Sequence, residues 1–188
     1  MKRYEEVFFE IVRSALWRTP AEIPSDFTDW ASLIRLAKAQ ALMGLVGDVL
    51  LTTPHIISSF PPVVVQKLQE IPMNSMAMHT MLNNTVILVV TQLRKHGIEP
   101  VLLKGQGIAR YYAVPELRQC GDIDIYVGEQ NYEAAYDALM PIVTEIDDKD
   151  AIYKEVKHFH AKVGSVLIEV HRFADVNAYP KLDKVYQK

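Results

Sequence analysis

Cysteine is nearly absent from this sequence, since Cys120 is the only one among 188 residues. A lone cysteine excludes an internal disulfide bond and a zinc site made of several thiolates, and it fits a reducing compartment. Long hydrophobic runs are missing as well, because no apolar stretch approaches the roughly 18 residues that cross a bilayer. Acidic residues soon after Met1 interrupt any secretory signal. We therefore expect a cytoplasmic protein with no membrane-embedded segment.

An excess of one charge sign is also lacking. The formal net charge is -3, which gives no indication of a general surface for binding polyanions. Hydrophobic residues make up 49% of the chain and charged residues 23%, and these fractions exclude bulk disorder and collagen-like repeats. Acidic residues outnumber basic ones only in the second half of the chain. The motifs that suggest chemistry lie in that same half.

The first 97 residues are expected to be helical. Apolar residues recur there at helical spacing, and this spacing predicts helices over residues 4–16, 26–40, 41–51, 63–70 and 72–96. Ser25 or Asp26 is the expected N-cap of the second helix. Pro72 is expected to separate the last two helices, and Gly97 suits the position just past a helix end.

The pattern changes to short strands at Ile98. The sequence then predicts a buried strand over residues 100–103, a loop over 104–107, a helix over 108–112, a strand over 122–127 and a helix over 132–139. An acidic loop follows around Asp147. We therefore expect an α/β (α+β) protein with a helical region at residues 1–97 and a core at residues 98–188.

A β-hairpin is the clearest local signal. Residues 158–163 and 166–171 alternate between polar and apolar side chains, and Gly164-Ser165 between them is typical of a type II′ turn. This register pairs Phe159 with Val170 on an apolar face.

The polar face of the same hairpin pairs His160 with Glu169 and His158 with His171. Three interpretations of this cluster remain open. The histidines could line a nucleotide site, form a structural hydrogen-bonded network, or bind a transition metal such as Zn²⁺ or Fe²⁺.

Two aspartates predict a site for a hard cation. Asp122 and Asp124 alternate with apolar residues in a strand, so both carboxylates point to one side. Carboxylate oxygens are ligands that Mg²⁺ prefers in proteins. Upstream, Lys104-Gly105-Gln106 lies between a predicted strand and a predicted helix, an arrangement that favours phosphate binding.

Taken together, these motifs resemble the uncharacterised nucleotidyltransferase family of the polymerase-β-like superfamily. The resemblance covers about residues 80–173 and depends on Val101-Leu-Leu-Lys-Gly-Gln-Gly107, Tyr112, Pro115, Arg118, Gly121-Asp-Ile-Asp-Ile-Tyr-Val127 and Ile168-Glu-Val-His171. It implies a nucleotidyltransferase-like core, with a short mixed sheet flanked by helices. It also implies transfer of a nucleoside monophosphate from an NTP to a hydroxyl by a two-metal mechanism.

The resemblance also assigns roles to residues. Asp122, Asp124 and Glu169 would be catalytic and would bind Mg²⁺ (or Mn²⁺). The nucleotide-binding residues would be Lys104, Gly105, Gln106 and Arg118. Lys104 could instead be a solvated side chain, and Arg118 could simply pair with Glu116 or another acid nearby. The acceptor is left open among a protein side chain, an RNA end and a small molecule, and the sequence does not indicate an oligomeric state.

Gln106 departs from the superfamily pattern, which favours Gly or Ser at this position. This departure keeps a second function open, that of a catalytically inactive nucleotide-binding or interaction module. A third is a metal-binding protein that uses the His/Glu face of the hairpin. Similar proteins run well beyond this length, so we expect the core to be truncated at its C-terminus.

Overall fold

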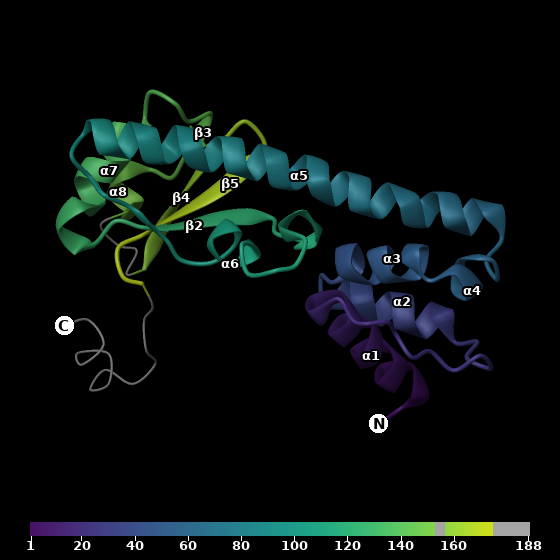
Figure 1. The fold of residues 1–188 in the computed structure, drawn as a ribbon. Coiled ribbons are helices and arrows are strands. Elements are labelled where there is room, and N and C mark those ends of the chain that lie inside the picture. The colour runs from purple at the N-terminus through teal and green to yellow at the C-terminus, as the bar shows by residue number, and fades with distance from the viewer. Residues whose placement is uncertain (153–156, 175–188) are drawn as a thin grey trace. The chain divides into compact units, whose positions relative to one another are not determined.

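The chain forms two compact units in the computed structural model, which describes residues 1–152 and 157–174 (Figure 1). The helical unit contains residues 1–80 and 108–120, and the sheet unit contains residues 81–107 and the described residues from 121 onward. Helix α5 contributes residues to both. The division of the chain at residues 97 and 98 remains a prediction about domains.

The helical unit is built from short helices around an apolar core. Its elements are α1 (Arg3–Trp17), α2 (Trp30–Ala39), α3 (Met43–Thr52), α4 (Pro54–Ile57), the first part of α5 (Pro62–Lys95) and the 3-10 helix η1 (Pro115–Leu117). Ile11, Leu33 and Leu50 are fully buried in this core. They lie on the apolar stripes that the helical spacing predicted.

The start of α2 lies later than predicted. Asp29 is the N-cap, and its side chain accepts a hydrogen bond from the backbone N–H of Ser32 at 3.3 Å. Asp26 pairs with Arg3 instead. The prediction of Ser25 or Asp26 as the cap was wrong because Phe27 is buried against Trp30, with ring centroids 4.7 Å apart, and the chain turns before the helix begins.

Pro72 does not separate two helices, contrary to the prediction. It lies inside α5, which runs unbroken from Pro62 to Lys95. A proline in a helix interior removes one backbone hydrogen bond and crowds the carbonyl four residues earlier. Here that carbonyl belongs to Leu68, which is buried in the core of the helical unit. Packing of this turn therefore outweighs the local cost of the proline.

Close packing explains a glycine in α3. An added Cβ at Gly44 would lie 2.2 Å from the backbone oxygen of Leu117, whereas the nearest atom to a Cβ at Gly47 would be 3.8 Å away. Helix α3 therefore contacts the backbone of η1 at Gly44, and only a residue without a side chain fits at this position.

The sheet unit holds a five-stranded mixed sheet, which confirms the predicted α+β fold. Its strands are β1 (Val101–Leu102), β2 (Asp122–Tyr126), β3 (Glu145–Ile146), β4 (His158–Val163) and β5 (Val166–His171). They follow the order β1-β2-β5-β4-β3. The β2–β5 pair is parallel and the other pairs are antiparallel. Short helical elements accompany them, namely α6 (Gln106–Ala109), η2 (Glu129–Asn131), α7 (Tyr132–Leu139) and α8 (Lys149–Ile152).

The two faces of this sheet differ in chemistry. On the apolar face, Phe159 of β4 contacts Tyr132 and Tyr136 of α7, with ring centroids 5.2 and 5.4 Å apart. The last part of α5 joins this layer, since Gln92 donates a hydrogen bond to the backbone oxygen of Ala138 at 2.9 Å. Figure 1 shows α7 and this part of α5 beside the strands. The opposite face, which we call the polar face, carries the acids and histidines.

The hairpin has the predicted register. Phe159 pairs with Val170, His160 with Glu169, and His158 with His171. Gly164 has a φ of 59°, while Ser165 has no positive φ, as a type II′ turn requires.

Two predictions near β1 were wrong. Among the described residues only β2 pairs with this strand, so β1 is an edge strand, and Val101 is 53% exposed rather than buried. Helix α6 begins at Gln106, inside the predicted loop. The segment around Asp147 likewise contains β3 and α8 rather than loop alone.

Among residues 1–152 and 157–174, none of the helices combines the length and the apolar character that crossing a bilayer requires.

Candidate active site

Three carboxylates gather on the polar face of the sheet. Asp124 of β2 and Glu169 of β5 are direct partners in the parallel ladder. Asp122 lies two residues before Asp124, on the same face of β2. Asp124 is only 2% exposed, and burial of a charged group is costly without a partner. The sheet therefore brings the three predicted acids to one surface, and the buried negative charge of Asp124 needs a positively charged or hydrogen-bonding partner.

Lys104 supplies that compensation. Its Nζ lies 2.7 Å from Oδ1 of Asp124, and 57% of the lysine side chain remains exposed. The hydrogen bond to Asp124 raises the pKa of Lys104, and the charges of Glu169 and Asp122 add to this effect. The ammonium thus interacts with all three acids, so the interpretation of Lys104 as a merely solvated side chain was wrong.

The charge state of Asp124 follows from two opposing effects. Burial raises the pKa of this carboxyl, but the hydrogen bond and charge of Lys104, together with His171, hold it below its usual range. Asp124 is therefore an anion at neutral pH.

His171 joins two of the acids from beneath the polar surface. It is 1% exposed, and its Nε2 lies 3.1 Å from Oδ1 of Asp124 and 3.5 Å from Oε2 of Glu169. Burial lowers the pKa of this imidazole despite its acidic neighbours. Its Nδ1 is buried without a hydrogen-bond partner among the described residues. A neutral ring that carries its proton on Nε2 satisfies both observations, because this N–H then donates a hydrogen bond to Asp124 and Nδ1 carries no proton.

A second histidine continues the chain of contacts outward. The Nε2 of His160 lies 3.9 Å from Oε1 of Glu169, and its Nδ1 lies 3.1 Å from Oδ2 of Asp147. Asp147 also accepts a hydrogen bond from the backbone N–H of His160 at 2.7 Å. The sequence did not single out Asp147 as a site residue. Its position one residue after an edge strand was the available signal, and the sequence does not mark β3 clearly.

The predicted phosphate-binding turn follows β1. Gly105 has a φ of 54°, a left-handed conformation that favours glycine. Gln106 begins α6, and its side-chain Nε2 donates to Oδ1 of Asn83 at 2.7 Å. One side-chain donor of Gln106 is therefore engaged by α5. The binding of phosphate by Lys104, Gly105 and Gln106 remains a prediction.

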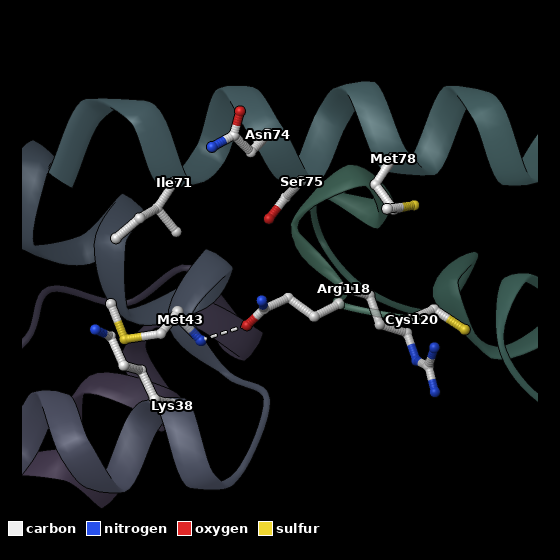
Figure 2. A pocket seen from close by; sticks show the side chains of 9 residues that line it. Lys38, Met43, Ile71, Asn74, Ser75, Met78, Arg118 and Cys120 are labelled. Carbon is white, nitrogen blue, oxygen red and sulfur yellow. Dashed lines mark hydrogen bonds between the residues drawn. The ribbon is translucent and has the colours of Figure 1, made fainter. Parts of the chain in front are cut away.

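Arg118 lies in the helical unit, in the wall of a cavity of about 410 Å³ (Figure 2). The cavity is lined by Lys38, Met43, Ile71, Asn74, Ser75, Met78, Arg118, Gln119 and Cys120. The dashed line in Figure 2 marks the hydrogen bond that Oε1 of Gln119 accepts from the backbone N–H of Met43 at 2.7 Å. Nη1 of Arg118 is buried without a hydrogen-bond partner among the described residues. A nucleotide-binding role for Arg118 stays a prediction.

The three acids fit a hard divalent cation. They offer oxygen donors alone, which suits Mg²⁺ or Mn²⁺. The ammonium of Lys104 at Asp124 shows independently that positive charge is stabilised at this point. A second donor set, made of His158, Glu169 and His171, contains imidazole nitrogens and differs in chemistry.

The fold and this site define an α+β protein whose parallel strand pair carries acids on one face. The model of a family described as uncharacterised nucleotidyltransferase matches residues 26–185, and the chain belongs to this family. The resemblance inferred from the sequence is therefore confirmed. No curated protein and no solved structure matched the chain.

Proposed function

We propose that this protein transfers a nucleoside monophosphate from an NTP to a hydroxyl group of an acceptor. The acceptor oxygen forms a bond to the α-phosphorus, the bond from that phosphorus to the β-phosphate oxygen breaks, and pyrophosphate leaves. Membership of the nucleotidyltransferase family supports this class of reaction. The single observation that carries it is the pairing of Asp124 with Glu169 across parallel strands, with Asp122 on the same face.

Each acid has a role in this proposal. Asp122, Asp124 and Glu169 would hold Mg²⁺ or Mn²⁺, and bound cations of this kind stabilise the entering and leaving oxygens of an in-line displacement. Glu169 would accept the proton of the acceptor hydroxyl, because it is 20% exposed while Asp124 is buried. Asp124 would remain an anion throughout, since His171 and Lys104 stabilise its charged form.

Positive groups would offset the charge of the triphosphate. Lys104 is exposed over more than half of its side chain, so its ammonium can turn from Asp124 toward a phosphate oxygen when other cations occupy the acids. Gly105 and Gln106 would lie beside the β- and γ-phosphates, and Arg118 would add a further cation. We expect this chemistry in the cytoplasm, where a lone cysteine stays reduced.

A second candidate is a nucleotide-binding module without turnover. Gln106 favours it, because its amide is bonded to Asn83 where the superfamily favours a small residue. A bulky side chain held in this way would hinder the close approach of the backbone to phosphate. This module would bind an NTP and release no pyrophosphate with any acceptor.

Calorimetric titration of each NTP with Mg²⁺ or Mn²⁺ tests the proposal. We expect binding that requires the metal and is lost in the Asp122→Asn/Asp124→Asn double variant. Glu145→Gln is a matched control, because Glu145 lies in the same sheet but pairs with Lys162 at 2.7 Å. Equal binding by the double variant would refute the proposed site. Binding without pyrophosphate release would favour the inactive module.

A further inference from the structure

Two imidazoles and one carboxylate converge where β4 and β5 pair. His158 and His171 face each other in the antiparallel register, with ring centroids 5.0 Å apart. Glu169 lies two residues before His171 on the same face of β5. Each of the three side chains offers one possible ligand atom, and these atoms all lie within 4.8 Å of one another.

Two of these side chains have nitrogen atoms that nothing in the described chain satisfies. The Nδ1 atoms of His158 and His171 are both buried and have no hydrogen-bond partner among the described residues. Buried polar atoms are almost always satisfied in proteins, so two such atoms on facing rings call for an explanation. An imidazole nitrogen without a proton is a ligand for Zn²⁺ and related ions.

His171 also has the surroundings of a metal-binding histidine. Histidines that bind metal usually donate the N–H of the other ring nitrogen to a carboxylate, which fixes the tautomer and the ring orientation. The Nε2 of His171 lies 3.1 Å from the buried carboxylate of Asp124. This contact leaves Nδ1 as the basic nitrogen of the ring, while Nε2 is the ring atom that lies 3.5 Å from Oε2 of Glu169.

We propose that His158, Glu169 and His171 bind one divalent ion of the Zn²⁺ class. Around a tetrahedral ion with bonds of about 2.0–2.2 Å, ligand atoms lie about 3.3–3.6 Å apart. Side-chain rotations would therefore bring the three ligand atoms closer than their present limit of 4.8 Å. Two nitrogens and one oxygen suit Zn²⁺ or Co²⁺ better than Mg²⁺, which prefers oxygen alone. Three protein ligands also leave a position open for water or another oxygen ligand.

This site does not depend on nucleotidyl transfer. It shares Glu169 with the proposed Mg²⁺ site, but it uses neither Asp122 nor any phosphate. The Asp122→Asn variant should therefore lose NTP binding that requires Mg²⁺ and keep the second site. Failure of NTP to bind the wild-type protein would refute the proposed function alone.

The test is titration of the chelator-treated full chain with Co²⁺, followed by visible absorption. We expect one equivalent of Co²⁺ with the intense bands of a four-coordinate ion, and displacement of that ion by Zn²⁺. His158→Gln should weaken binding about a hundredfold, since loss of an outer-shell partner already costs 10–100-fold. His96→Gln is the matched control, because His96 belongs to the sheet unit, is none of the three ligands, and has its Nδ1 3.0 Å from the backbone oxygen of Gln92. It should leave the affinity for Co²⁺ unchanged.

Three results would overturn the site. These are an absence of four-coordinate bands, an equal loss of affinity in His96→Gln, and loss of Co²⁺ binding in Asp122→Asn, which would place the ion among the oxygen ligands instead. Circular dichroism of each metal-free variant checks the fold. If His158→Gln does not fold, Glu169→Gln should show the same weakening beside Glu145→Gln as its control.

Discussion

The helical unit and the sheet unit bury polar side chains in different ways. In the helical unit, the buried hydroxyl of Ser14 donates to a backbone oxygen, that of Thr19. In the sheet unit, the buried carboxylate of Asp124 contacts the ammonium of Lys104 and the imidazole of His171, so side chains compensate its charge. A fold gains little from burying a charge that it must then compensate. The comparison indicates that packing governs the helical unit and chemistry governs the polar face of the sheet.

The largest expected effect tests the close packing of the helical unit. Gly44→Ala should lower the free energy of unfolding of the helical unit by about 3 kcal/mol, because the new Cβ would overlap backbone. Urea denaturation followed by tryptophan fluorescence measures this unit, since Trp17 and Trp30 both belong to it. Gly47→Ala is the control and should be neutral or stabilise by up to about 1 kcal/mol, as alanine favours a helix interior. Equal losses in both variants would contradict the close contact at Leu117.

A smaller effect tests the compensation of charge in the sheet unit. Lys104→Met should raise the pKa of Asp124, because burial then acts without the opposing ammonium. The lysine is mostly exposed, so we expect a stability loss of only about 1 kcal/mol at neutral pH. Carboxyl-carbon NMR titration and urea denaturation measure the two quantities. Lys162→Met, which removes an exposed pair with Glu145, should leave both nearly unchanged. An unchanged pKa of Asp124 would refute the pairing.

The smallest effect is a pH dependence of stability in the presence of a chelator. Burial lowers the pKa of His171 below its ordinary value of 6.5, so the unfolded chain takes up this proton before the folded chain does. The contribution of His171 to the unfolding free energy should therefore be constant well above pH 6.5 and fall as the pH drops toward the folded-state pKa. His171→Gln should remove this part of the slope, as measured by urea denaturation across the pH range. A wild-type slope of the opposite sign would contradict a buried neutral imidazole.

Local patterns predicted much of the sheet unit. The hairpin register follows from period-two alternation and a two-residue turn, both of which can be read over 14 residues. Alternation likewise placed Asp122 and Asp124 on one face of a strand. These features need no knowledge of distant partners, which is why the sequence sufficed.

Features that depend on distant contacts were missed. The continuity of α5 through Pro72 depends on burial of Leu68 against other helices. The ion pair of Lys104 with Asp124 depends on antiparallel pairing of β1 with β2 across 20 residues. Neither signal is present in the neighbouring sequence. The role of His171 as a bridge between two acids was missed for the same reason.

The turn at Gly164-Ser165 also constrains how this protein can change during evolution. Most surface turns accept an added or deleted residue, since a longer loop costs little entropy. Here β5 is fixed to β2 and β4 is fixed to β3, so an odd change in turn length would rotate the side chains of one strand to the opposite face. Whether β4 or β5 is the strand that rotates, His158 and His160 of β4 would no longer lie on the same face as Glu169. Descendants of this sequence can therefore vary many loops in length, but this turn should keep two residues for as long as the polar face is under selection.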